Sequence, residues 1–248
     1  MRNPWNYFLL FLISSFVLAS CEKDEVDDEE NPLPVSHVAY GSEDRQWLNL
    51  YLADSNVPTP VYFFSHSNGA TADDVQGFVA DLQEAGISTI SWESELIIDS
   101  FEDIETCWAD AELMIQWVKN NAEQYNLDMN NLLIGGRSRG SIASWKLAHS
   151  QEDSIRGIYM FQALPDGAWG NLDEWNPTED ISALSADIKL TYKLEPGTVD
   201  IHDPENGALI LSRYEELGIE ENSSLSHSLG SDPQLYADIS EWCLGRIQ

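Results

Sequence analysis

Residues 132–145 read LLIGGRSRGSIASW, and this stretch decides the fold. It opens with a short apolar run of the kind that forms a buried strand. Two glycines, a serine between two arginines and a third glycine follow. The next residues have helical spacing, with Ile142, Trp145 and Leu147 on one side. The stretch therefore predicts a strand, a tight turn that carries Ser138, and a helix.

The turn fits the pattern G-x-S-x-G over residues 136–140. On its own the pattern is weak, since many turns match it by chance. Between a strand and a helix, however, it is typical of a nucleophilic serine, which must project from a tight turn. Glycines on either side let the strand and helix approach without Cβ clashes. The helix N-terminus also presents N–H groups to a developing oxyanion. We predict that Ser138 is a nucleophile; the alternative is a serine in an ordinary turn.

Outward from this stretch, strand-like and helix-like segments alternate along the chain. This alternation indicates βαβ units and a mostly parallel sheet with helices on both faces. An antiparallel opening pair makes the predicted sheet mixed, and residues 37–248 show no second-domain boundary. The predicted strands cover 38–40, 47–52, 61–65, 88–92, 131–135, 157–161 and 188–194, with another near Ser224, and the predicted helices cover 71–84, 101–125, 141–149, 205–217 and 232–244.

Composition and charge exclude some classes of function. The 248 residues are 43% hydrophobic and 10% aromatic, which is enough for a full core. The net charge of −31, from 12 basic and 43 acidic residues, argues against nucleic-acid binding, because phosphate contacts need clustered Lys and Arg. The five His and three Cys show no metal-ligand spacing, so we expect neither a metal nor a cofactor.

The N-terminal segment is a targeting signal in this interpretation. Arg2 precedes a mostly apolar run over 7–18, and small residues lead to Cys21. The ending Leu-Ala-Ser-Cys resembles the bacterial lipobox, which implies lipidation of Cys21 and anchoring in the cell envelope. An uncleaved membrane anchor is the alternative, although the run is shorter than the roughly 20 residues that span a bilayer. Residues 22–36, with the run EKDEVDDEE, are predicted to be a disordered tether.

Two cysteines remain after Cys21. Cys107 lies on the predicted helix over 101–125 and Cys243 on the last predicted helix. These helices should cover opposite faces of the sheet, so we expect both thiols to be free and buried.

A serine nucleophile needs a histidine base, and two histidines follow Ser150. On such a fold the catalytic residues occur in the order Ser, acid, His. His227 is the predicted base, because it lies between a possible last strand and the terminal helix; the alternative is a solvated loop histidine. His202 is interpreted as a loop side chain.

The acid is expected after the predicted strand over 188–194. The candidates are Glu195, Asp200 and Asp203. We favour Asp200, which Pro204 and a helix follow. Asp203 instead suits a turn or a helix cap.

The oxyanion would be bound by two backbone N–H groups. One is predicted to be that of Arg139, the residue after the nucleophile. The other is predicted in the loop His-Ser-Asn-Gly after the strand over 61–65, from Asn68 or Ser67. We expect His66 to brace this loop through hydrogen bonds and not to act as a base.

Three stretches, taken together, resemble the α/β-hydrolase superfamily and, within it, the carboxylesterase and feruloyl-esterase-like branch. They are VAYGSEDRQWLNLYLA, DAELMIQWVKNNAEQYNLDMNNLLIGGRSRG and DIHDPENG, in family order. The resemblance implies a serine esterase with a Ser-His-Asp triad and an acyl-enzyme, acting on short-chain or polysaccharide-borne acetyl or feruloyl-type esters.

The sequence departs from this branch in two loops. His-Ser-Asn-Gly replaces the usual His-Gly-Gly-Gly, and Ser-Leu-Ser-His replaces Gly-x-Gly-His. These departures leave open a non-catalytic binding lipoprotein on a hydrolase scaffold. A serine peptidase of the same fold is a further alternative.

The segment after the predicted strand over 157–161 is too short for a large cap, so we expect an open, shallow site. We also expect the protein to be a monomer. Trp169 and Trp175 lie in this segment, either at the substrate or in the packing. Arg137 and Arg139 flank the nucleophile and suit either a substrate carboxylate or ion pairs within the protein, with Asp73, Asp74 or Asp110 as expected partners.

Overall fold

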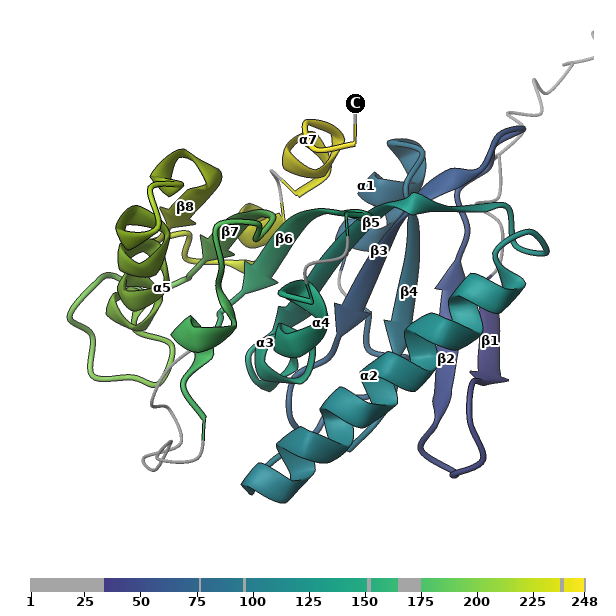
Figure 1. Ribbon diagram of the computed structural model, residues 1–248, viewed down its shortest axis with the longest axis horizontal. Helices are drawn as coiled ribbons and strands as arrows, with labels where there is room; N and C mark the ends of the chain where they lie inside the picture. Colours follow the sequence, from purple (N-terminus) through teal and green to yellow (C-terminus); the bar gives the residue numbers. More distant parts are fainter. Residues whose placement is uncertain are drawn as a thin grey trace, which may run out of the picture. The chain divides into compact units, whose positions relative to one another are not determined.

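The computed structural model describes residues 34–75, 77–95, 97–150, 153–164, 175–236 and 239–247. Cys21, Trp169 and most of the predicted tether lie outside these residues. An eight-stranded sheet runs through the described chain in the order β1-β2-β4-β3-β5-β6-β7-β8 (Figure 1). The strands are β1 (Val35–Ala39), β2 (Trp47–Tyr51), β3 (Thr59–Ser65), β4 (Ser88–Trp92), β5 (Leu127–Arg137), β6 (Ile155–Phe161), β7 (Asp187–Thr191) and β8 (Ser223–Ser226).

The sheet is mixed, as predicted. β1 pairs with β2 and β2 with β4 in antiparallel fashion, and every other pair is parallel. Parallel strands end at a common edge, so the loops that follow β3, β5, β7 and β8 gather there, which is where α/β sheets place their sites. The predicted nucleophile, acid and histidine loops all lie at this edge.

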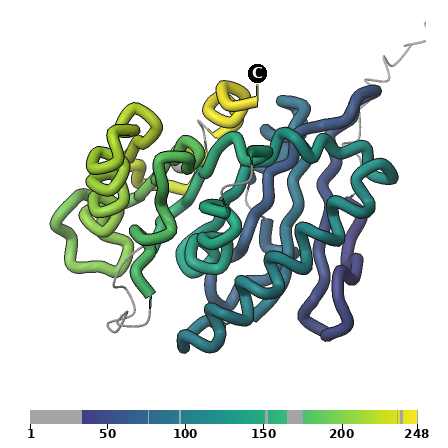
Figure 2. The backbone as a smooth tube through the Cα atoms, in the orientation of Figure 1, coloured from purple at the N-terminus to yellow at the C-terminus, as the bar shows by residue number. Residues whose placement is uncertain are grey.

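Helices cover both faces of the sheet (Figures 1 and 2). One apolar cluster contains buried side chains of α2 and Cys107, and the other contains those of α1 and α7 with Cys243. Both cysteines are buried and neither forms a disulfide, as predicted. The helices are α1 (Phe78–Glu84), α2 (Phe101–Asn121), α3 (Arg139–Ala143), α4 (Trp145–Ala148), α5 (Pro204–Glu216), α6 (Asp232–Tyr236) and α7 (Ile239–Leu244), with 3-10 turns η1 (Pro177–Asp180) and η2 (Glu220–Asn222).

Local side-chain hydrogen bonds explain where several helices begin. α2 begins after Ser100 in a capping box, in which Ser100 and Asp103 each accept from the other's backbone N–H. The helix predicted over 71–84 starts only at Phe78, because Asp74 accepts from the Thr71 N–H and closes a turn. The helix predicted over 141–149 is interrupted at Ser144 and forms α3 and α4.

No helix within the described residues is long and apolar enough to cross a bilayer.

Candidate active site

Ser138 lies in a strained turn between β5 and α3. Its φ of 53° and ψ of −121° are unusual for a residue with a side chain. The Ser138 N–H donates to the carbonyl of Phe161 at 3.0 Å, which ties the turn to the end of β6. The predicted strand, turn and helix are therefore present around this serine.

The two glycines of the pattern are required by close backbone contacts. A Cβ on Gly136 would lie 2.4 Å from the backbone of Gly140. A Cβ on Gly140 would lie 2.1 Å from the Ser65 carbonyl oxygen and 2.4 Å from that of His66. The start of α3 therefore packs directly against the end of β3, which places the loop after β3 beside Ser138.

His202 is the histidine that contacts Ser138. Its Nε2 lies 3.0 Å from Ser138 Oγ, and its Nδ1 lies 3.1 Å from Asp200 Oδ1. Asp200 Oδ1 also accepts the backbone N–H of His202 at 2.8 Å. The loop after β7 thus supplies both an imidazole and a carboxylate that orients it.

His227 was predicted to be the base that contacts Ser138, but the structure places His202 there. His227 Nδ1 lies 2.6 Å from Ser228 Oγ and 3.7 Å from Glu195 Oε2, and no described contact joins it to Ser138. The physical reason is local: the turn at Asp200 holds the ring of His202 close to Ser138, in the turn between β5 and α3. His202, interpreted from sequence as a loop side chain, takes the position predicted for His227.

The surroundings of His202 favour its neutral form. Burial lowers the pKa of His202, and the charges of Arg137 and Arg139 lower it further, against the opposing effect of Asp200. The hydrogen bond from the His202 N–H holds the pKa of Asp200 below its usual value. A neutral imidazole that donates to Asp200 through Nδ1 leaves Nε2 free to accept the Ser138 proton.

The other two acid candidates have different partners. Asp203 caps α5 by accepting the N–H of Glu205 at 2.9 Å, and it also accepts that of Gly197 at 3.1 Å. This is the capping role that the sequence suggested. Glu195 lies beside His227 and is largely exposed.

The loop after β3 is held in place by its own side chains. Asn68 donates through Nδ2 to the Ile98 carbonyl at 3.0 Å and accepts the Ile98 N–H at 3.1 Å. Gly69 has a φ of +75°, in the left-handed region that glycine adopts freely. The altered sequence His-Ser-Asn-Gly therefore forms an ordered loop.

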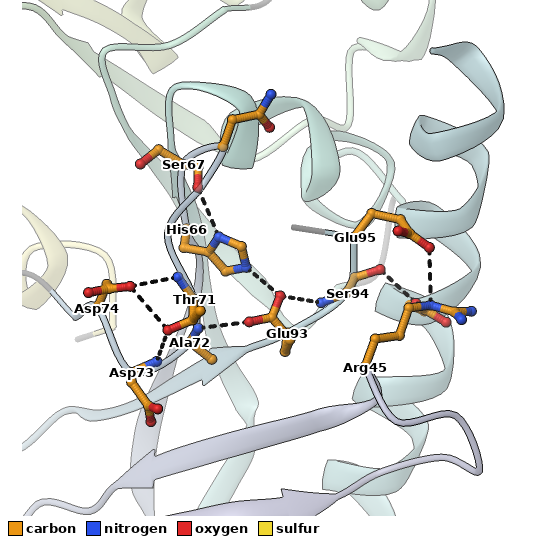
Figure 3. A network of polar contacts seen from close by, with 12 residues as sticks. Arg45, His66, Ser67, Thr71, Ala72, Asp73, Asp74, Glu93, Ser94 and Glu95 are labelled. Carbon is orange, nitrogen blue, oxygen red and sulfur yellow. Dashed lines mark hydrogen bonds and ion pairs between the residues drawn. The ribbon is translucent and has the colours of Figure 1, made fainter. Parts of the chain in front are cut away.

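A chain of buried polar contacts lies beneath this loop (Figure 3). His66 contacts the Ser67 carbonyl through Nδ1 at 3.0 Å and Glu93 through Nε2 at 2.8 Å. This is the bracing that the sequence suggested for His66. Next to Glu93, the Ser94 hydroxyl donates to Asp110 at 2.6 Å, and Arg45 contacts the same carboxylate at 2.9 Å.

The two arginines beside Ser138 differ in their surroundings. Arg137 donates to the Tyr236 hydroxyl at 2.8 Å and to Asp232 at 3.2 Å, and Lys193 also pairs with Asp232. Arg137 therefore takes part in an ion pair within the protein, which is one of the two alternatives that the sequence left open, and Asp232 is a partner that was not predicted. Burial lowers the pKa of Arg139 to about 10.

Trp175 is a packing residue in the structure. It is buried against Trp108 and Trp145, with ring centroids 5.1 and 6.5 Å apart, and its Nε1 donates to Asp180 at 2.8 Å. A ring in this position offers no surface to a substrate, so the packing alternative holds for Trp175. Trp169 lies outside the described residues.

A cavity of about 610 Å³ lies between α5 and β8. Leu211 and Leu225 contribute apolar walls, Glu205 and Glu215 contribute carboxylates, and His227 lines one end. Ser138 and His202 do not line this cavity. Among the described residues, no group of His, Cys, Asp and Glu side chains is arranged to hold a metal ion.

Sequence reasoning missed His202 and the partner of His66. The signal for His202 was the spacing Asp-x-His at 200–202, since an aspartate two residues away can fix a histidine in one turn. Glu93 had no local signal, because 27 residues separate it from His66.

The sequence matches no family model and no curated protein. The structure nevertheless resembles many solved structures. A truncated carbohydrate esterase from gut microbiota superposes with a TM-score of 0.68 at 14% identity, over 88% of this chain and 98% of that one. An esterase from Mycobacterium marinum gives 0.65 at 15% identity, over 86% and 82%. An acetyl ester-xyloside bifunctional hydrolase from Caldicellulosiruptor lactoaceticus gives 0.61 at 15%, over 85% and 94%.

Identities this low establish the arrangement of the backbone and nothing finer. The eight-stranded, mostly parallel sheet with its helices matches α/β-hydrolase structures among these neighbours. The chain therefore has the α/β-hydrolase fold.

Proposed function

We propose that this protein is a serine hydrolase of carboxylic esters, with Ser138 as nucleophile, His202 as general base and Asp200 as the carboxylate that orients it. The observation that carries the proposal is the contact of 3.0 Å between Ser138 Oγ and His202 Nε2, made at a strained strand–turn–helix elbow. An activated serine is recognised by a hydrogen bond to its base, which in turn is hydrogen-bonded to an orienting group.

The chemistry follows from this geometry. Ser138 Oγ attacks the ester carbonyl carbon while its proton passes to His202 Nε2, and Asp200 stabilises the resulting imidazolium. The tetrahedral intermediate collapses, its bond to the alcohol oxygen breaks, and His202 returns the proton to the leaving alcohol. Water then loses a proton to His202 and attacks the acyl-Ser138 carbonyl. Collapse of this second intermediate releases the carboxylic acid and restores the Ser138 hydroxyl.

The backbone N–H groups of Arg139 and Asn68 are the proposed donors to the oxyanion, with Ser67 as the alternative donor in the loop. Packing of Gly140 on the Ser65 and His66 carbonyls supports this, because it places the loop after β3 next to the elbow. Removing one such donor typically costs about 10²–10³ in kcat in serine hydrolases.

The substrate class proposed is an acetyl or similar short ester on a polysaccharide. Two structural neighbours with this fold are a carbohydrate esterase and an acetyl ester-xyloside hydrolase. The short segment between β6 and β7 also leaves little chain to build a large cap over Ser138. The location proposed is the bacterial cell envelope, through lipidation of Cys21 in the sequence Leu-Ala-Ser-Cys.

The activity is tested on p-nitrophenyl acetate, acetylated xylan and feruloylated oligosaccharides, together with labelling by a fluorophosphonate probe. Wild-type protein should hydrolyse p-nitrophenyl acetate and be labelled, whereas Ser138→Ala should lose both properties, with at least about 10⁴-fold less turnover. Ser141→Ala, a second serine at the same turn, is the matched control and should still be labelled. An unlabelled, inactive wild type would instead favour a non-catalytic binding protein.

A further inference from the structure

The imidazole of His66 is enclosed between two groups that only accept hydrogen bonds. Its Nδ1 lies 3.0 Å from the Ser67 carbonyl oxygen and its Nε2 lies 2.8 Å from Glu93 Oε1. The His66 and Glu93 side chains are 6% and 3% exposed, so water cannot substitute for either partner. Neutral imidazole has one N–H, whereas both contacts here require a donor.

Glu93 accepts further hydrogen bonds. Its Oε2 accepts the Ala72 N–H at 3.1 Å, and its Oε1 accepts the Ser94 N–H at 3.1 Å as well as the contact from His66. Donors face both of its carboxyl oxygens. The contacts therefore define a buried imidazolium–carboxylate pair.

This pair helps to fix the direction of one peptide group in the loop, whose Ser67 carbonyl also accepts the Ala70 N–H at 3.0 Å. The Ser67 carbonyl points at the His66 ring, and the described residues contain no cis peptide bond. In a trans peptide the C=O and the following N–H point in opposite directions. The Asn68 N–H is thus turned away from His66, and no hydrogen bond joins it to another described residue. The two bonds between the Asn68 side chain and Ile98 hold the residue in place.

We propose that His66 is a positioning residue that must be doubly protonated: held by Glu93, it orients the Ser67–Asn68 peptide so that the Asn68 N–H faces the oxyanion. The inference rests on the proposed function and adds a charge requirement to it. Loss of either ring proton breaks one of the two contacts. Loss of the Nδ1 proton leaves the Ser67 carbonyl with the Ala70 N–H, at 3.0 Å, as its remaining described donor. The orientation of the Ser67–Asn68 peptide is then less fixed, and the donor to the oxyanion is weakened.

The surroundings of His66 favour its charged form. Burial lowers its pKa, but the hydrogen bond and charge of Glu93, the Ser67 carbonyl and the charge of Asp74 together raise it above the usual value. Glu93 faces the ring from the end of β4 and Asp74 from the segment before α1. Tyr40, between β1 and β2, donates to the Glu93 carbonyl. While Glu93 is ionised, the positioning is present below the usual histidine pKa and is lost as pH rises through the raised pKa of His66.

The test compares Glu93→Gln with Glu95→Gln, its matched control. Both changes remove one carboxylate from the same segment, but Glu95 is more exposed and pairs with Arg45. Glu93→Gln should lower kcat on p-nitrophenyl acetate by about 10–100-fold with little change in KM, because one oxyanion donor is misplaced. The alkaline limb of the pH–rate profile of this variant should also move to lower pH. Glu95→Gln should keep the wild-type values. A Glu93→Gln variant with wild-type kcat and pH profile would overturn the proposal.

A second measurement does not depend on a variant that folds. Nitrogen-15 NMR of the histidine side chains in the wild type should show one ring with protons on both nitrogens at neutral pH, protected from exchange. An active wild type in which every buried histidine carries a single ring proton would overturn this inference alone. An inactive, unlabelled wild type would instead refute the proposed function.

Discussion

The loops after β7 and β8 make an informative comparison, because each places a histidine beside a carboxylate at the same edge of the sheet. The His202 side chain is 23% exposed and lies between Ser138 and Asp200. The His227 side chain is 42% exposed and lies between Ser228 and Glu195. Similar composition thus gives one ring that contacts Ser138, the proposed nucleophile, and one that has no described contact with it. Hydrogen bonds within each loop make the difference, not the order of residues along the chain.

The largest expected effect comes from replacing each histidine in turn. His202→Ala should lower kcat on p-nitrophenyl acetate by about 10³–10⁵-fold, because the serine then has no base. His227→Ala should change it by less than about threefold. The measurement is steady-state kinetics at neutral pH, with circular dichroism as the control for folding. A greater loss in His227→Ala would reverse the comparison.

The carboxylates of the two loops should differ in the same way. Asp200→Asn should lower kcat by about 10²–10⁴-fold, since the amide cannot stabilise the imidazolium. Glu195→Gln should have no measurable effect, because its partner His227 does not contact the nucleophile. If both variants lost activity equally, the two loops would have to act together, contrary to the structure.

A smaller effect is expected at the elbow that both loops approach. Gly140→Ala places a Cβ 2.1 Å from the Ser65 carbonyl oxygen, so β3 and α3 must separate. We expect a loss of about 1–3 kcal/mol in the free energy of unfolding, together with reduced activity. Gly77→Ala is the control, since its Cβ meets nothing closer than 4.0 Å. Urea denaturation followed by fluorescence gives the free energy of unfolding of each variant. Equal stability of the two variants would contradict the described packing.

The smallest effect is a displacement of the acid limb of the pH–rate profile. Because burial and the two arginines lower the pKa of His202, this base should stay unprotonated to a pH below the ordinary histidine value of about 6.5. Activity should therefore persist at mildly acidic pH and fall only as His202 gains a proton. Arg139→Gln removes one positive charge and should move the limb of kcat/KM to higher pH. If His227→Ala moved the acid limb and Arg139→Gln did not, the titrating group would lie in the loop after β8.

The sequence predicted the sheet well where the pattern was local. β4 occupies the same residues as its prediction, and the nucleophile turn lies where the glycines require it. α1 was too long in the prediction because the turn at Thr71 and Asp74 depends on a side-chain hydrogen bond that periodicity does not detect.

The site was harder to predict because its contacts join distant or competing residues. The choice of His227 followed a rule about chain order, whereas the Asp200 turn that directs His202 is a local feature with no periodic signal. The contact of His66 with Glu93 depends on β3 and β4 lying side by side in the sheet. Likewise, the contacts of Arg137 with Tyr236 and Asp232 bring the end of β5 to α6, about a hundred residues later in the chain.

The central claim is that His202, and not His227, activates Ser138. Its most direct test is the second-order rate constant for phosphonylation of Ser138 by a fluorophosphonate, measured for wild type, His202→Ala and His227→Ala by intact-protein mass spectrometry. This rate reports activation of the serine without acyl-enzyme hydrolysis or product release. The structure predicts a large loss in His202→Ala and a wild-type rate in His227→Ala. A wild-type rate in His202→Ala with a large loss in His227→Ala would contradict it.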